Sequence, residues 1–300
     1  MKSILNFVNI CLMMFILLVS SLFYGCSKEN DEQVLPSKGA MTSVVKAVAD
    51  NVPYIQEVLD EKIYNIQDGV RAIDVTLTYC RKETHLYITE IDLSKNVTII
   101  TSIPSSGSTQ TVTEQIQANT SMDIDVLLGI NGYPDGVSYQ YGTELSASYT
   151  RDSDKVFYLL NDGKAYISTV GEFNLHKDKV VNAIGGSHSL LIDGEVTDFI
   201  VSDNTMTFLP RTFVGVTKDH MKVYFFVVDG GMDGNSGMRL EDIMLVCQGA
   251  GCYQAINLEG KEASAIVYKV DVNNYNLMNK PSGGVEKAVS NGLQVIVKND

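Results

Sequence analysis

The stretch RTFVGVTKDHMKVYFFVVDG, residues 211–230, decides the fold. Two apolar runs, Thr212–Thr217 and Lys222–Val228, lie on either side of a short polar segment. Runs rich in β-branched and aromatic residues predict strands, so we expect a strand pair here. Arg211 stands at the start of this pair, and Asp229 at its end precedes a glycine, a combination that favours a turn.

Alternation of apolar and polar residues extends the strand prediction away from this pair. The further predicted strands are Ile73–Leu77, His85–Leu93, Asn96–Ile103, Val137–Tyr149, Lys155–Leu160, Ala165–Val170, Ser189–Ile192, Val196–Ser202, Tyr253–Leu258, Ala263–Val270 and Val289–Val297. Helical patterns cover Thr42–Ile66, where Pro53 kinks or splits the helix, and also Thr111–Ala118 and Met238–Gln248. The sequence therefore predicts an α+β fold of mixed, strand-rich sheets with a few flanking helices.

The N-terminus predicts export. Residues 10–23 are almost wholly apolar and too short for a comfortable membrane span, which is typical of a secretory signal. The apolar run ends at Gly25-Cys26 and an acidic polar segment follows, which resembles the lipoproteins of Bacteroides-type bacteria. We expect a signal peptide over residues 1–25, lipidation of Cys26, a tether over 26–40, a helical segment over 41–70 and the main domain over 71–300. A plain secreted protein cut near Gly25 is the alternative.

Charge and cysteines narrow the function further. The 300-residue chain has a formal net charge of -13, which would repel a nucleic-acid backbone, so we expect no nucleic-acid partner. Besides Cys11 and Cys26, the chain has Cys80, Cys247 and Cys252. Cys247 and Cys252 either pair or remain buried thiols. Since no histidine lies near them at metal-ligand spacing, we expect no metal site.

An ordered set of short motifs carries a family resemblance. They are Glu90-Ile91-Asp92-Leu93, Asn131-Gly132, Ala183-Ile184-Gly185-Gly186, Arg211-Thr212 with Gly215 and Thr217, Val228-Asp229-Gly230, Ser236-Gly237-Met238, Asn257-Leu258-Glu259-Gly260 and Ser290-Asn291. This order resembles the phosphodiester glycosidase family. The most characteristic family segment, Asn-Leu-Asp-Gly-Gly-Gly-Ser-Ser, is altered here to Asn-Leu-Glu-Gly-Lys-Glu-Ala-Ser over residues 257–264, and the family's Glu-Arg pair is here Glu286-Lys287.

The resemblance implies roles for individual residues. Glu259 and Glu286 would activate water or stabilise positive charge on the sugar, and Arg211 would clamp the phosphate. The implied substrate contacts are Asn131, Gly132, Gly186, Thr212, Asp229, Ser236, Ser264 and Asn291. Plainer readings stay open, because Arg211 could pair with a carboxylate, Asp229 could form a turn and Glu286 could be a solvated charge. No cofactor is expected.

The leading hypothesis is an outer-membrane lipoprotein of the cell envelope, with the cell surface as one location, that hydrolyses a sugar-1-phosphate diester or a related glycan. The altered segment 257–264 favours a rival hypothesis, an inactive relative that binds glycan or cell-wall polymer without cleaving it. A structural partner of other envelope proteins is a second rival. Convergence of Arg211, Glu259 and Glu286 on one pocket is expected under the leading hypothesis.

Overall fold

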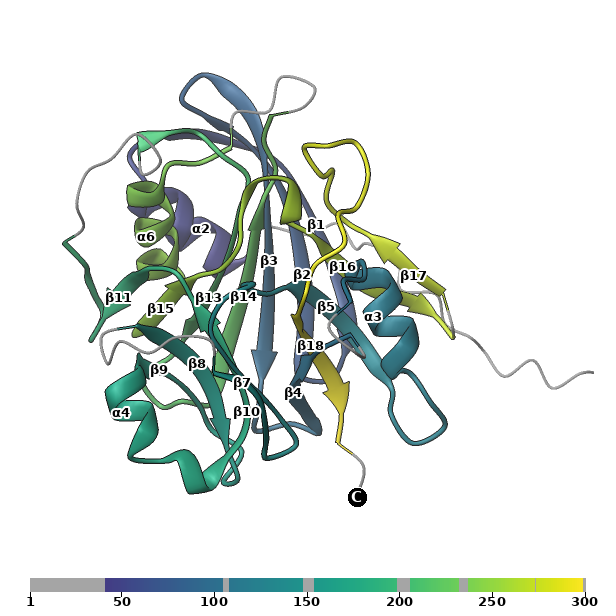
Figure 1. Cartoon of the computed structure of the whole chain (residues 1–300). Coiled ribbons are helices and arrows are strands. Elements are labelled where there is room, and N and C mark those ends of the chain that lie inside the picture. Colours follow the sequence, from purple (N-terminus) through teal and green to yellow (C-terminus); the bar gives the residue numbers. More distant parts are fainter. Residues whose placement is uncertain are drawn as a thin grey trace, which may run out of the picture. The chain divides into compact units, whose positions relative to one another are not determined.

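The computed structural model describes residues 41–104, 108–147, 154–198, 206–231, 237–272 and 274–298. The predicted signal peptide and tether, with Cys26, lie outside these residues, as does Ser236. No helix within the described ranges has both the length and the apolar character needed to cross a membrane. The described strands form three sheets in which every pairing is antiparallel, with a few helices beside them (Figure 1). The predicted strand-rich α+β class is therefore confirmed.

The largest sheet contains the predicted strand pair Thr212–Thr217 and Lys222–Val228. Its strand order is β1 (Ile55–Gln67), β2 (Val70–Tyr79), β3 (Lys82–Asp92), β14 (Lys222–Val228), β13 (Arg211–Val216), β15 (Gln254–Asn257), β11 (Ser189–Ile192) and β12 (Glu195–Val196). β13 and β14 pair from Arg211↔Val228 to Val216↔Val223, and β3 lies beside β14. Strands β14, β13 and β15 from the last third of the chain thus lie between β3 on one side and β11 on the other.

Two smaller sheets complete the strand framework. One has the order β7 (Thr143–Ala147), β6 (Val137–Gln140), β10 (Val180–Gly186), β8 (Lys155–Leu160) and β9 (Ala165–Thr169). The other has the order β17 (Asn274–Leu277), β16 (Ile266–Asp271), β5 (Val126–Asn131), β18 (Gly292–Val297) and β4 (Val97–Ser102). Thr101 of β4 donates from Oγ1 to the carbonyl of Ala183 in β10 at 3.1 Å, so a buried hydrogen bond joins these sheets.

Helices cover the outer faces of the sheets. They are α2 (Ser43–Asn51), α3 (Val112–Asn119), α4 (Val170–Asn174) and α6 (Leu240–Gly249), with 3-10 turns η2 (Lys177–Lys179) and η3 (Lys261–Ala263). Helices α2 and α6 lie side by side on one face of the large sheet (Figure 1), where Asn51 Nδ2 donates to the carbonyl of Leu245 at 2.9 Å. The opposite face of that sheet packs on the two smaller sheets.

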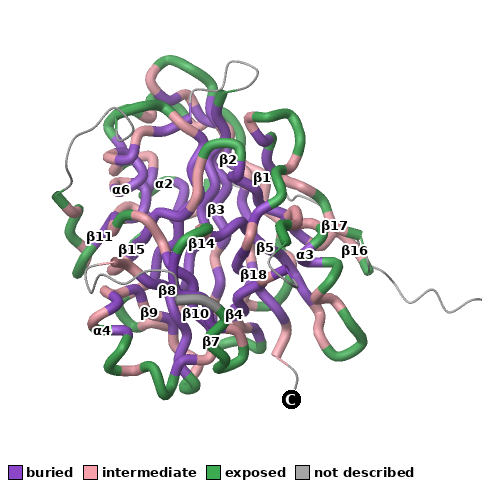
Figure 2. Tube along the Cα trace, in the orientation of Figure 1, coloured by how far each residue is buried: buried purple, intermediate pink, exposed green. Residues whose placement is uncertain are grey.

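Most residues of the central strands are buried, and these strands are mainly purple in Figure 2, whereas edge strand β1 has no buried residue. One apolar cluster lies between the large sheet and helices α2 and α6, and includes Phe213, Phe226 and Val228. A second cluster lies between the large sheet and the smaller sheets, and includes Val214, Phe225 and Val227. Neighbouring residues of β13 and β14 thus point to opposite clusters, which decides where the polar side chains at the strand ends point.

Several sequence expectations differ from the structure, and strand β17 was not expected at all. The helix expected over Thr42–Ile66 ends at Asn51, because Pro53 cannot continue it, and Ile55–Gln67 is instead edge strand β1 paired with β2. The single strand expected over Val137–Tyr149 is a hairpin of β6 and β7, turned at Tyr141 and Gly142 with φ of 50° and 78°. Strand β10 was not expected, since its glycine-rich end was interpreted only as a segment before a hairpin.

Candidate functional site

Five segments that are distant in sequence converge at one end of the strands. We call them the loop cluster: residues 131–136, 207–212, 229–231, 257–265 and 279–291. Backbone hydrogen bonds join them, because Glu259 N donates to the carbonyl of Gly132 at 3.0 Å and Lys261 N to that of Pro210 at 3.0 Å. Gly132 N donates in turn to the carbonyl of Asn291 at 3.0 Å. Most of the predicted site residues therefore belong to one connected region.

Asn131 holds the centre of the loop cluster and is fully buried. Its Nδ2 donates to the carbonyl of Gly132 at 3.2 Å and to that of Glu259 at 2.8 Å. Its Oδ1 accepts from Thr212 Oγ1 at 2.8 Å and from Ala265 N at 3.1 Å. Asn131 and Thr212 were both predicted to contact the substrate. In the structure their polar atoms instead form hydrogen bonds that link β5, β13 and the segment after β15.

Replacement of Asn131 by Ala is expected to lower the free energy of unfolding by about 2–3 kcal/mol, because each buried partner left unsatisfied costs about 1–3 kcal/mol. Urea denaturation of the full chain would measure this. Thr212→Val is the matched control: it removes only one of the four hydrogen bonds and should cost about 1 kcal/mol. Equal effects of the two variants would contradict the central role of Asn131.

Gly132 and Asn291 are packed against each other. A Cβ atom added at Gly132 would lie 2.2 Å from Asn291 Oδ1 and 2.3 Å from Ile184 Cδ1, so only glycine fits. Asn291 Nδ2 donates to the carbonyl of Tyr133 at 2.7 Å. Gly186 is similarly constrained, since a Cβ there would lie 2.4 Å from Ile256 Cδ1. These three predicted contacts therefore shape the scaffold of the site in this structure.

Glu259 is the predicted catalytic group whose carboxylate remains accessible. Its backbone is fixed on both sides by Gly132 and Asn131, while its side chain is 28% exposed and lies 3.4 Å from Lys287 Nζ. Burial raises the pKa of the neighbouring Tyr133, and the charges of Asp135 and Glu259 add to the effect. A general base must lie within hydrogen-bond reach of the water that it activates, and an accessible carboxylate on a fixed backbone is compatible with that role.

The altered motif includes Glu259 and continues through the loop that follows it. Lys261 has φ of 60°, in the left-handed region where a Cβ atom is unfavourable, and the family has glycine at this position. Gly260 could not carry a Cβ, which would lie 2.7 Å from the carbonyl oxygen of Pro210. The side chains of Lys261 and Glu262 are exposed, whereas Ala263 and Ser264 are buried. The loop thus keeps a backbone shape suited to glycine although it carries lysine.

Arg211 lies on the other face of β13 from Thr212. Arg211 is paired with Val228, which faces the helix-covered cluster, and Thr212 with Val227, which faces the smaller sheets. The buried guanidinium donates from Nε to the carbonyl of Met238 and from Nη2 to that of Thr207, both at 3.2 Å. Burial lowers its pKa to about 10, so Arg211 stays charged at neutral pH.

Glu286 binds the N-terminus of helix α3. Its Oε1 accepts from Thr113 N at 2.9 Å and its Oε2 from Thr113 Oγ1 at 2.7 Å. Carboxylates are favourable at this end of a helix because the first N–H groups lack partners within the helix. The helix already has a capping box between Thr111 and Glu114, and Glu286 ties it to the loop cluster. The structure thus gives Glu286 a partner rather than leaving it a solvated charge.

Asp229 is 1% exposed and accepts several hydrogen bonds. The donors are Tyr87 OH at 3.1 Å, Asn279 Nδ2 at 3.2 Å and Lys280 N at 3.1 Å to each carboxylate oxygen. Burial raises the pKa of Asp229, and these donors act in the opposite direction. Asn279 also donates to the carbonyl of Ser264 at 2.9 Å. Asp229 therefore anchors the loop after β17 to the end of β14.

Two further predicted features can be placed. Ser264 is 1% exposed, and its hydroxyl has no hydrogen-bond partner among the described residues.

Cys247 and Cys252 are buried free thiols, and Cys252 N donates to the carbonyl of Cys247 at 3.0 Å. In the described ranges no group of three or more His, Cys, Asp or Glu side chains is placed to hold a metal ion.

A family model described as phosphodiester glycosidase matches residues 107–296, which include all the predicted catalytic and substrate-binding residues. The chain belongs to the phosphodiester glycosidase family. No curated protein matches it. The altered segment 257–264 lies within the matched region, so the departure from the family pattern occurs inside the family's own domain.

Solved structures share the fold of this phosphodiester glycosidase family member. The catalytic domain of zebrafish N-acetylglucosamine-1-phosphodiester alpha-N-acetylglucosaminidase, auto-inhibited by its pro-peptide, is similar with a TM-score of 0.59 and 18% identity, over 91% of this chain and 99% of that one. A hypothetical protein from Synechocystis matches with a TM-score of 0.57 and 11% identity, over 81% of this chain and 64% of its own. A protein from Burkholderia pseudomallei K96243 matches with a TM-score of 0.56 and 11% identity, over 72% and 74%.

Sequence reasoning missed several residues of the loop cluster. Asn279 links Asp229 to Ser264, and Tyr133 lies beside Glu259. Asn279 lies outside the motifs that carried the family resemblance, so no sequence signal pointed to it. Tyr133 directly follows Asn131-Gly132, and its position next to that motif could have identified it.

A histidine–carboxylate pair adjoins Asp229. His85 Nδ1 lies 3.1 Å from Asp74 Oδ1, and this hydrogen bond is the main cause that raises the pKa of His85 above 6.5, with smaller contributions from Asp229 and Glu83. Burial acts in the opposite direction, and Lys62 Nζ lies 3.8 Å from Asp74. The folded state therefore binds the His85 proton more tightly than the unfolded state does.

The expected consequence is a stability contribution that is fully present below pH 6.5 and is lost as the pH rises through the folded pKa of His85. Urea denaturation across this range should show that the wild type loses more stability with rising pH than His85→Gln does. Asp74→Asn should bring the His85 pKa, followed by NMR, back toward its ordinary value. An unchanged His85 pKa in that variant would contradict the assignment.

Proposed function

We propose that this family member hydrolyses a sugar-1-phosphate diester or a related glycan. The observation that carries the proposal is Glu259, whose backbone is held by Asn131 and Gly132 while its carboxylate stays accessible. Of the two glutamates implied by the resemblance, Glu286 is engaged by helix α3, so Glu259 is the better candidate for the base.

In the proposed reaction a water molecule attacks the anomeric carbon and gives its proton to Glu259. The bond between that carbon and the phosphate oxygen breaks, and the phosphate leaves with the electron pair. Strong protonation of this leaving group is not needed, because a phosphate monoester is stable as an anion with a second pKa of about 6. One positioned carboxylate then supports the reaction, whereas ordinary glycoside hydrolysis usually needs two.

A rival function is glycan binding without cleavage, and the loop after Glu259 favours it. Lys261 holds a left-handed conformation that the family gives to glycine, and Glu259 is one methylene longer than the family's aspartate. A shift of about 1 Å in a catalytic group can cost about 100-fold in rate.

Incubating the full chain with UDP-glucose, UDP-N-acetylglucosamine and a methyl diester of glucose-1-phosphate would separate the two functions. Release of free sugar, together with UDP from the nucleotide sugars or methyl phosphate from the methyl diester, supports hydrolysis if it is strongly slowed in Glu259→Gln. Saturable binding without release supports the rival. Release that is unchanged in Glu259→Gln would contradict the proposed role of this carboxylate.

We also propose that the protein is anchored to the cell envelope through Cys26, as an outer-membrane lipoprotein. The support is the sequence pattern alone, an apolar run ending at Gly25-Cys26 with an acidic segment beyond. Lipid chains anchor proteins because each buried methylene contributes about 0.8 kcal/mol. Cys26→Ala is expected to move the protein to the soluble fraction or to block its processing. A processed variant that still fractionates with membranes would refute the anchor.

A further inference from the structure

A polar pocket of about 500 Å³ lies on the helix-side face of the large sheet, beyond the part that α2 and α6 cover. It is formed where β14 begins and β3 ends, whereas the loop cluster lies where β14 ends. Lys222 in the pocket and Asp229 in the loop cluster are seven residues apart on an extended strand, which separates them by about 20 Å. The pocket is therefore distinct from the candidate active site.

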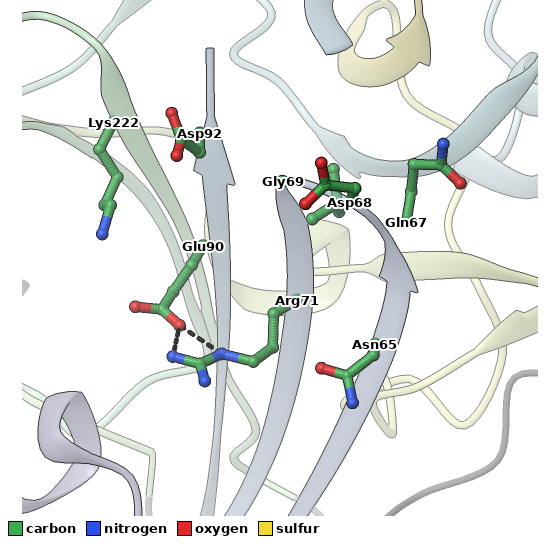
Figure 3. A pocket seen from close by; sticks show the side chains of 9 residues that line it. Asn65, Gln67, Asp68, Gly69, Arg71, Glu90, Asp92 and Lys222 are labelled. Atoms are coloured by element: carbon green, nitrogen blue, oxygen red, sulfur yellow. Dashed lines mark hydrogen bonds and ion pairs between the residues drawn. The ribbon is translucent and has the colours of Figure 1, made fainter. Parts of the chain in front are cut away.

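A row of polar side chains crosses four strands here, and three of its members, Asn65, Arg71 and Glu90, line the pocket. Asn65 of β1 is paired with Arg71 of β2, Arg71 with Glu90 of β3, and Glu90 with Tyr224 of β14. Directly paired residues project from the same face of a sheet, so the four side chains are neighbours. Arg71 Nε donates to Glu90 Oε2 at 2.6 Å, which fixes the guanidinium in the middle of the row (Figure 3).

Several polar side chains in and beside this row have no protein partner. Within the described ranges, the amides of Asn65 and Gln67 and the ammonium of Lys222 form neither a hydrogen bond nor an ion pair. Figure 3 shows Asn65 and Gln67 on one side of the Arg71–Glu90 pair, with Lys222 and Asp92 on the other. Donors and acceptors thus surround the pocket, and their side chains are available to a ligand.

The charges in the pocket nearly cancel. Arg71 is paired with Glu90, and Lys95 Nζ lies 3.3 Å from Asp68. Lys222 and Asp92 are cross-strand partners of opposite charge. The lining has three carboxylates and two cations, and Lys95, which lies beside the pocket, balances Asp68. So small a net charge does not select a strongly charged ligand, so selection must come from hydrogen bonds.

We propose that this pocket binds a neutral polyhydroxylated ligand, a stretch of glycan chain. Each hydroxyl of a sugar both donates and accepts a hydrogen bond. The carboxamides of Asn65 and Gln67 and the neighbouring Arg71–Glu90 pair likewise offer donors and acceptors side by side. A pocket of this volume holds a ligand of about two or three sugar rings. A peptide fits less well, because apart from Gly69 and Val70 the lining residues are polar or charged. A peptide strand could be added only at edge strand β1, so a neutral Gly/Ser/Asn peptide is tested beside the sugars.

Calorimetric titration of the full chain with maltotriose, mannotriose and N,N′-diacetylchitobiose would test the proposal, with ligand at up to about 10 mM to detect millimolar affinity. At least one probe should bind. The Asn65→Ala/Gln67→Ala variant should bind it at least about tenfold more weakly, equivalent to about 1.4 kcal/mol. Both side chains are exposed, so this variant is expected to fold.

Glu259→Gln is the matched control and should leave this affinity unchanged, because Glu259 belongs to the loop cluster. Asn65→Ala/Gln67→Ala should leave any hydrolysis of a small sugar phosphodiester unchanged, so failure of the pocket and failure of the proposed activity are distinguishable. The proposal is overturned if no probe binds, if the affinity depends on Glu259 and not on Asn65 and Gln67, or if only a neutral Gly/Ser/Asn peptide binds in the pocket.

Discussion

Replacement of Glu259 by Gln is expected to slow hydrolysis of a sugar phosphodiester by about 100-fold or more, because general acid–base catalysis by a positioned group contributes about 10²–10⁴-fold. Gln keeps the size of the side chain and its approach to Lys287, and only the basic oxygen is lost. The backbone bonds to Asn131 and Gly132 remain, so the free energy of unfolding should change little. Steady-state rates and urea denaturation of the same preparations would measure both.

Glu286→Gln is the matched control for this variant. Its carboxylate binds Thr113 at the start of α3, so its loss should lower stability by about 1 kcal/mol and leave the rate nearly unchanged. A loss of rate in Glu286→Gln as large as that in Glu259→Gln would contradict the division of roles between the two glutamates.

Local patterns predicted most of the strands but not β1, β10 or β17, and they predicted the packing of the site poorly. Strands β8 and β14 begin and end where alternation and turn residues placed them, and the order of motifs identified the family. The extent of α2 was wrong because valines and isoleucines after Pro53 fit either a helix face or a strand. Only pairing with β2, a long-range interaction, decides in favour of the strand.

The roles of the site residues depend on contacts that sequence does not show. Alternation along β13 does predict that Arg211 and Thr212 leave the strand on opposite faces. The alternation does not predict which of the two faces contacts the loop cluster. That face is set by the packing of β5 and of the segment after β15 against β13. The sequence likewise predicted Asn131 as a ligand, because it does not show the hydrogen bonds that occupy this side chain. Its partners include residues up to 134 positions away in the chain.

The triple variant Glu259→Asp, Lys261→Gly and Glu262→Gly is expected to raise the rate of sugar phosphodiester hydrolysis by up to about 100-fold, the penalty that a displacement of about 1 Å can impose. Asp restores the family's shorter carboxylate, and glycines restore the bare backbone beside it. Glycine at 261 also removes part of the cost of about 1–2 kcal/mol that a side chain incurs at φ of 60°. Ala263 is left unchanged, because a serine hydroxyl in its buried apolar surroundings would cost about 1–3 kcal/mol without a partner.

Arg81→Gly controls for the change in backbone strain. Arg81 has φ of 66° in the turn between β2 and β3, so its replacement should stabilise the chain by a similar amount without altering the rate. The three changes in the triple variant adjoin one another, so their effects on rate should not add, and each single variant has to be measured beside the triple. A folded triple variant with no gain in rate would show that the shape of residues 259–262 does not limit hydrolysis, which removes the main argument for the glycan-binding rival.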